Sequence, residues 1–86
     1  MRGEQVIARA FGGAAVVLRV WGVGDGVVYL ASEAEFQKRE VGRMALEPIG
    51  FPAADVFAYD ETFPLGTPNR SDWNRLQRWQ TTERQP

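Results

Sequence analysis

The sequence contains neither cysteine nor histidine among its 86 residues. Without cysteine the chain can form no disulfide bond and has no thiolate for catalysis or for binding a metal. Without histidine it lacks the usual general base at neutral pH and the commonest metal ligand. These absences exclude zinc fingers and most hydrolase and oxidoreductase mechanisms. We therefore expect no enzymatic activity, no metal site and no cofactor.

A strong charge imbalance and a long apolar run are also missing. The formal net charge is −1, so the chain as a whole lacks the basic excess typical of nucleic-acid-binding proteins. Residues 1–66 carry six basic against nine acidic side chains, whereas residues 67–86 carry four against two. No segment is as long as a membrane helix, and the apolar stretch 10–18 runs on into Arg19 instead of a cleavage site. The sequence predicts a cytoplasmic protein that contacts no membrane.

What the chain does contain is a β-rich pattern. Hydrophobic residues make up 44% of the sequence, which is typical of a folded domain. The segments 5–11, 14–23 and 27–31 are predicted to form an antiparallel three-stranded meander. Its turns are Gly12-Gly13 and Asp25-Gly26, dipeptides that accept the positive φ angles of tight hairpins.

The Asp25-Gly26 turn fixes a register in which Val23 pairs with Val28, Trp21 with Leu30, and Val20 with Ala31. Side chains alternate across a sheet, so this register predicts two largely apolar faces. One face carries Val16, Leu18, Val20, Val27 and Tyr29, and the other carries Val17, Arg19, Trp21, Val23, Val28 and Leu30. Because a solvated sheet face is normally polar, each face is expected to have a cover.

The next segment favours a helix. Ser32 and Glu35 have the spacing of a capping box, and Lys38 and Arg39 suit the C-terminal end of a helix dipole. We predict a helix over 33–41, in which Glu33 and Glu35 supply helix N-terminal charge and not an acid–base pair. Residues 44–52 are predicted to be irregular, and 55–59 to form a final strand.

The C-terminal part is predicted to form a separate covering element. Pro64, Gly66 and Pro68 indicate a linker. A helix over 71–82 would place Trp73, Leu76 and Trp79 on one face. There they would cover the sheet face that contains Val17 and Trp21, either in the same chain or in a second copy. The predicted organisation is a β-rich core (1–60), a linker (61–70), and a C-terminal helix and tail (71–86).

The predicted fold class is therefore mainly β with two short helices (α+β). The segment Gly50-Phe51-Pro52-Ala53-Ala54-Asp55-Val56 resembles the closing segment of SH3 domains, in which a Gly-aromatic-Pro run leads through a short 3₁₀ turn into the last strand. The resemblance implies a small SH3-like β-barrel. Asp55 stands where SH3 domains have a tyrosine of the proline-peptide groove, so the resemblance does not imply binding to proline-rich peptides.

Two groups of residues are candidates for binding. Trp21 and Arg19 share a strand face, where they would either hold a ligand or pack beneath a helix of the same chain. The other group is the predicted C-terminal stripe of Trp73, Leu76 and Trp79 with the nearby Arg75 and Arg78, which is either a docking helix or the lid of the core.

The hypothesis that best fits these features is a non-catalytic binding module that contacts another protein or a second copy of itself. The alternative is a small nucleic-acid-associated barrel that uses the basic C-terminal tail and exposed aromatic side chains.

Overall fold

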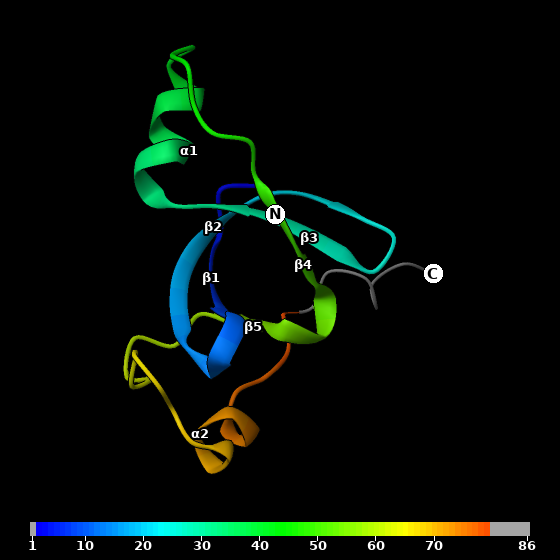
Figure 1. Cartoon of the computed structure of the whole chain (residues 1–86), viewed down its shortest axis with the longest axis vertical. Coiled ribbons are helices and arrows are strands. Elements are labelled where there is room, and N and C mark those ends of the chain that lie inside the picture. The colour runs from blue at the N-terminus through cyan, green and yellow to red at the C-terminus, as the bar shows by residue number, and fades with distance from the viewer. Residues whose placement is uncertain (1, 80–86) are drawn as a thin grey trace.

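A computed structural model of the chain describes residues 2–79. Its centre is one antiparallel sheet of five strands in the order β4-β3-β2-β1-β5. The strands are β1 (Gln5–Arg9), β2 (Ala15–Gly24), β3 (Val27–Ala31), β4 (Ile49–Pro52) and β5 (Val56–Ala58). Two short helices, α1 (Glu33–Glu40) and α2 (Arg70–Arg75), lie at opposite ends of the sheet (Figure 1). The predicted α+β class is confirmed.

The meander forms as predicted, but its first connection is longer than a two-residue turn. β1 ends at Arg9, and residues Phe11–Gly13 form a 3₁₀ turn in which the Gly13 N–H donates to the Ala10 carbonyl. Gly12 and Gly13 both have positive φ, 82° and 83°, which glycine adopts without steric cost. Phe11, predicted to lie in the strand, is instead fully exposed at the tip of this connection.

The register between β2 and β3 corrects the predicted pairing. Val23 pairs with Val28 as predicted, but Val20 pairs with Leu30 and Arg19 with Ala31. Trp21 is the extra residue of a β-bulge between these two stretches. A bulge inserts one residue without a partner and reverses the alternation beyond it. As a result Val20 shares a face with Val28 and Leu30, whereas the uninterrupted register had separated them.

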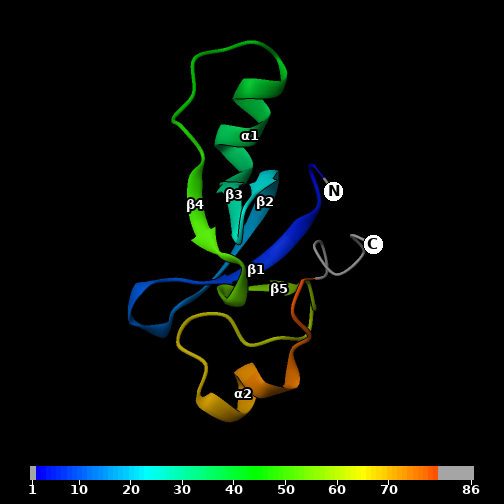
Figure 2. The ribbon, with the colours of Figure 1, turned by 90° about the vertical axis from the view of Figure 1, so that its right-hand side faces the viewer.

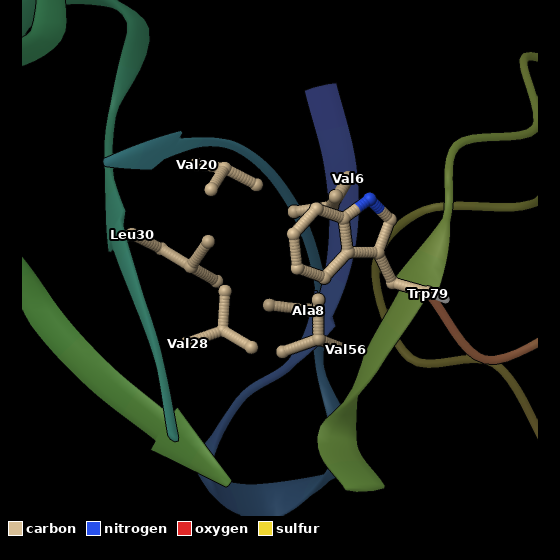
Figure 3. Packing of buried hydrophobic residues seen from close by; sticks show 7 residues of the cluster. All are labelled: Val6, Ala8, Val20, Val28, Leu30, Val56 and Trp79. Carbon is tan, nitrogen blue, oxygen red and sulfur yellow. The ribbon is translucent and has the colours of Figure 1, made fainter. Parts of the chain in front are cut away.

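The main core lies inside the curve of the sheet. Its buried side chains come from four strands and from the C-terminal segment: Val6, Ala8, Val20, Val28, Leu30, Val56 and Trp79. Figure 3 shows the β3 side chains and those of β1 and β5 pointing toward one another across this core, with the Trp79 ring among them. Val16 and Leu18 pack against the same cluster.

A second cluster lies on the other face of β1, β2 and β5. It contains Ile7, Ala15, Phe57, Phe63 and Trp73, with Val17 and Leu76 packed against it. β1 is therefore buried on both faces, since Val6 and Ala8 point to one cluster and Ile7 to the other. The C-terminal segment covers Val17 as predicted, through Trp73 and Leu76. Trp21, predicted to share this cover, lies beneath α1 instead.

The C-terminal segment is not one helix over 71–82. Helix α2 ends at Arg75, and Leu76 already has an extended ψ of 145°. Residues 77–79 then run antiparallel to β5: Ala58 N–H donates to the Gln77 carbonyl and Trp79 N–H to the Val56 carbonyl. This extension sends Trp73 and Trp79 to opposite faces of the sheet. Residues 80–82 of the predicted helix lie outside the described residues.

The remaining elements refine the predicted ones. α1 begins at the predicted Ser32 cap, whose Oγ accepts from the Glu35 N–H at 3.2 Å. Part of the stretch 44–52 that was predicted to be irregular is strand β4, and a 3₁₀ turn over Ala53–Asp55 leads from it into β5. The segment predicted as a linker contains the buried Phe63, and its Gly66 forms a bridge with Ala15. Within residues 2–79 there is no helix long and apolar enough to cross a membrane.

Candidate functional site

Trp21, a candidate from the sequence, is covered by its own chain. The bulge turns its ring toward α1, where it meets the Phe36 ring edge-on with a centroid separation of 5.5 Å. Two guanidinium groups also lie over the indole, with Cζ of Arg2 4.1 Å and Cζ of Arg39 5.2 Å from the ring centroid. Trp21 is therefore the residue of β2 on which α1 packs.

Arg19, its companion on β2, contributes to the same attachment. Its Nε donates to a Glu33 carboxylate oxygen at 2.7 Å, and its NH1 donates to the Gly3 carbonyl at 2.8 Å. The Gln37 amide also donates to the Glu33 carboxylate. This hydrogen bond, followed by the one from Arg19 Nε, lowers the pKa of Glu33. Arg19 therefore links Gly3 of the N-terminal segment to Glu33 at the start of α1 by hydrogen bonds.

The C-terminal candidates are divided between the two clusters. Trp73 is buried against Phe57 and Phe63, with ring centroids 5.1 and 5.2 Å away, and Leu76 packs beside them. Trp79 belongs to the main core instead. The structure therefore brings Trp73 and Leu76 together and separates Trp79 from both.

The two basic candidates lie close to aromatic rings. Arg75 pairs with Asp72 at 3.5 Å, one turn earlier in α2, and its Cζ lies 6.0 Å from the Phe63 ring centroid. Arg78 lies over the Phe57 ring at 5.7 Å. Neither arginine stands beside an exposed tryptophan among the described residues, because Trp73 and Trp79 are buried.

Several exposed large apolar side chains lie elsewhere, on the end of α1 and the loop that follows it. We call residues 32–48 the arm. Three large side chains of the arm and that of the first residue of β4 point into solvent. We call these four the arm surface: Val41 (67% exposed), Met44 (94%), Leu46 (72%) and Ile49 (65%). Figure 2 shows the arm rising from one end of the sheet and returning into β4.

The arm loop is held in place although its apolar side chains are exposed. The Glu35 carboxylate accepts from the Leu46 N–H at 2.8 Å, and Arg39 donates to the Leu46 carbonyl at 3.2 Å. The Leu46 hydrogen bond, followed by one from Lys38, lowers the pKa of Glu35. Both backbone polar groups of Leu46 are therefore bonded to α1, and the loop follows the helix.

The adjacent sheet edge favours contact through side chains over strand addition. Within residues 2–79, β4 pairs only with β3, so its other edge is free. The strand has four residues, is preceded by Pro48 and ends at Pro52. Short edges carrying proline resist pairing with another strand, because proline donates no backbone hydrogen bond.

A concave feature lies at the other end of the molecule. An open cleft of about 440 Å³ is lined by Ala58, Tyr59, Asp60, Glu61, Arg75, Leu76 and Gln77. The Asp60 carboxylate is already engaged by the hydroxyl and the N–H of Thr62, which lower the pKa of Asp60. The described residues contain no group of three or more Asp, Glu, His or Cys side chains placed to hold a metal.

The arm surface was not among the residues chosen from the sequence. Its residues fall in the stretch 44–52, which the prolines marked as irregular, and in the last turn before it. The missed signal was the density of large apolar side chains in a segment with no periodic pattern that would bury them. Comparison of the chain with models of protein families, with curated proteins and with solved structures finds no match.

Proposed function

We propose that this protein is a small, non-catalytic protein-binding module and that the arm surface is its contact site. The observation that carries this proposal is the exposure of Met44 and Leu46 on a loop anchored to α1, and of Val41 and Ile49 at its two ends. Clustered apolar side chains in solvent are costly unless a partner covers them. A loop whose backbone is already fixed loses little conformational entropy on binding.

The chemistry of the surface indicates the kind of contact. Met44 is an unbranched side chain that adapts to irregular partner surfaces. Arg43 and Glu47 alternate with the apolar residues in sequence and are exposed, which adds charges of both signs to the surface. An apolar centre with a polar rim is the usual composition of a protein–protein contact.

We also propose that the sheet belongs to the small SH3-like barrels. The strand order β4-β3-β2-β1-β5, the curved sheet around the main core, and the 3₁₀ turn between β4 and β5 support this architecture. Asp55, which stands at the tyrosine position of SH3 domains, forms an ion pair with Arg9 at 2.9 Å. That ion pair favours a partner other than a proline-rich peptide.

The proposal is tested by capturing partners from extract of the source cell with the tagged full chain and with variants. Met44→Asp and Leu46→Asp place a charge at the centre of the arm surface. Each should weaken capture more than tenfold, because a lost apolar contact costs about 2 kcal/mol. Phe11→Asp is the matched control, since Phe11 is equally exposed but lies on the β1–β2 connection.

Retention of the same protein by the wild type and by Phe11→Asp, with loss in both arm variants, supports the proposal. Equal capture by all four proteins contradicts it. Binding of a mixed-sequence oligonucleotide that weakens steeply with salt would favour the nucleic-acid alternative instead.

A further inference from the structure

Helix α1 is attached to the rest of the molecule by few apolar contacts. It has eight residues, and Phe36 is its only buried side chain. A helix this short is marginal by itself in water. Neither buried cluster contains a residue of the arm. The position of α1 therefore depends on the polar and aromatic contacts around Trp21.

Arg2 stands at the centre of those contacts. Its guanidinium lies over the Trp21 ring at 4.1 Å, and one of its nitrogens pairs with Glu40 in the last turn of α1 at 2.7 Å. A single side chain thus joins the strand β2 to the C-terminal end of the helix. Arg2 precedes Gly3, which is itself fixed to the sheet: its N–H donates to the Val20 carbonyl and its carbonyl accepts from Arg19.

We propose that Arg2 is a latch that holds the C-terminal end of α1 closed over Trp21, while the Arg19–Glu33 ion pair holds the start of the helix, and that releasing Arg2 loosens the arm while the five-stranded sheet stays folded. The proposal goes beyond the binding function and does not depend on it. The bonds that shape the arm, from Glu35 and Arg39 to Leu46 and from Lys38 to Glu35, all lie within the arm. They survive when the arm leaves the sheet, so the arm can open as a unit.

The latch is accessible to solvent and to ions. The side chains of Arg2 and Glu40 are 54% and 41% exposed, so salt screens their attraction. Release of the latch also uncovers the Trp21 ring, which gives the opening a spectroscopic signal.

The test is amide hydrogen exchange in the full chain, measured residue by residue. Arg2→Ala should raise the exchange rates of the α1 amides roughly tenfold, the effect expected from losing one cation–π contact and one exposed ion pair. The amides of β1, β2 and β3 should keep their wild-type rates. Arg2→Lys keeps the charge but loses the planar stacking group, so its α1 rates should fall between those of the wild type and of Arg2→Ala.

Arg9→Ala is the matched control. Arg9 also pairs with one carboxylate, that of Asp55, and its Cζ lies 5.1 Å from the ring centroids of Phe57 and Trp73. It has no contact with α1, so its removal should not raise α1 exchange selectively. In the wild type, raising the salt concentration should speed α1 exchange ahead of the sheet and shift Trp21 emission toward the red.

Two outcomes overturn the proposal. One is α1 exchange that is the same in Arg2→Ala and in the wild type. The other is α1 and sheet exchange that rise by one common factor, which would mean that the arm opens only when the whole domain unfolds. If Arg2→Ala does not fold, Arg2→Lys decides between selective and common opening, because it changes only the group that stacks on Trp21.

Discussion

Tyr29, on the outer side of β3, lies between two glycines on the neighbouring strands. It pairs with Gly22 of β2 and with Gly50 of β4. A Cβ on Gly50 would lie 2.9 Å from Val27 Cγ1 and 3.2 Å from Tyr29 Cε1, whereas a Cβ on Gly22 would have no atom within 4 Å. Gly50→Ala should therefore destabilise the protein by about 1–3 kcal/mol through overpacking, and Gly22→Ala should cost much less. Urea unfolding of both variants measures the difference, and equal midpoints would show that the Tyr29 ring moves aside freely.

Ser32 supplies one residue-scale contribution to α1. Its hydroxyl caps the Glu35 N–H, but the Glu35 carboxylate bonds to Leu46 and Lys38 instead of returning to Ser32. Ser32→Ala should then cost about 1 kcal/mol, the value of a single N-cap. Ser32→Asp retains an acceptor and should preserve the wild-type stability in a thermal melt. If Ser32→Ala has the same melting temperature as the wild type, the cap contributes nothing to the stability of the folded state.

At the scale of the element, the arm depends on ionised carboxylates. The pKa values of Glu33 and Glu35 lie below their ordinary value of 4.5 because of hydrogen bonds, mainly from Gln37 and from the Leu46 N–H. A lowered folded-state pKa means that the stabilisation is complete above the ordinary value and is lost as the pH falls through the lowered one. Arg19 and Lys38 then lose their ionised partners, Glu33 and Glu35.

We therefore expect α1 amides to exchange faster, relative to sheet amides and after correction for intrinsic rates, as the pH drops from 5 toward 3. Glu35→Gln should remove part of this dependence, because its side chain cannot ionise. If the ratio of α1 to sheet exchange rates stays constant across this pH range, the two carboxylates do not control the arm.

The C-terminal element shows where a periodic pattern reaches its limit. The i, i+3, i+6 spacing of Trp73, Leu76 and Trp79 predicted one helix face, and the first two residues do share a cluster. The helix ends because residues 77–79 pair with the edge of β5 and bury Trp79 in the main core. The stabilisation from this pairing and burial depends on a strand distant in sequence, so a local spacing pattern cannot predict it. The capping box that starts α2, formed by Asn69 and Asp72, was not predicted, because residues 61–70 were predicted to form a linker.

At the scale of the whole molecule, Trp79 closes the main core from outside the meander. Trp79→Ala should destabilise by about 3–5 kcal/mol, a large share of the 5–15 kcal/mol typical of a domain. Phe11→Ala, which removes an equally aromatic but fully exposed side chain, should change stability by less than about 0.5 kcal/mol. Urea unfolding followed by near-ultraviolet circular dichroism measures both. Equal midpoints would place Trp79 outside the cooperative core.

The sequence predicted the meander, the second hairpin turn, the Ser32 cap and the α+β class, because each depends on residues close together in the chain. It did not predict the bulge at Trp21, since alternation of apolar side chains is compatible with either register on a strand that is apolar on both sides. The arm surface was not predicted either, because periodic patterns indicate residues that a core buries and give no sign of apolar side chains that stay exposed. The residues it did propose as binding candidates proved to have partners within the chain.

The place of Trp79 has a consequence for synthesis on the ribosome. Strands β1, β2 and β3 emerge early and can pair with one another, but the cluster they enclose stays open to water until residue 79 has left the exit tunnel. Chains usually gain structure from the N-terminus as they emerge. Here Val6, Val20 and Leu30 of the nascent meander stay uncovered until the C-terminal segment has emerged. Chaperones that bind exposed aliphatic segments should therefore associate with this chain until its last tryptophan is in place.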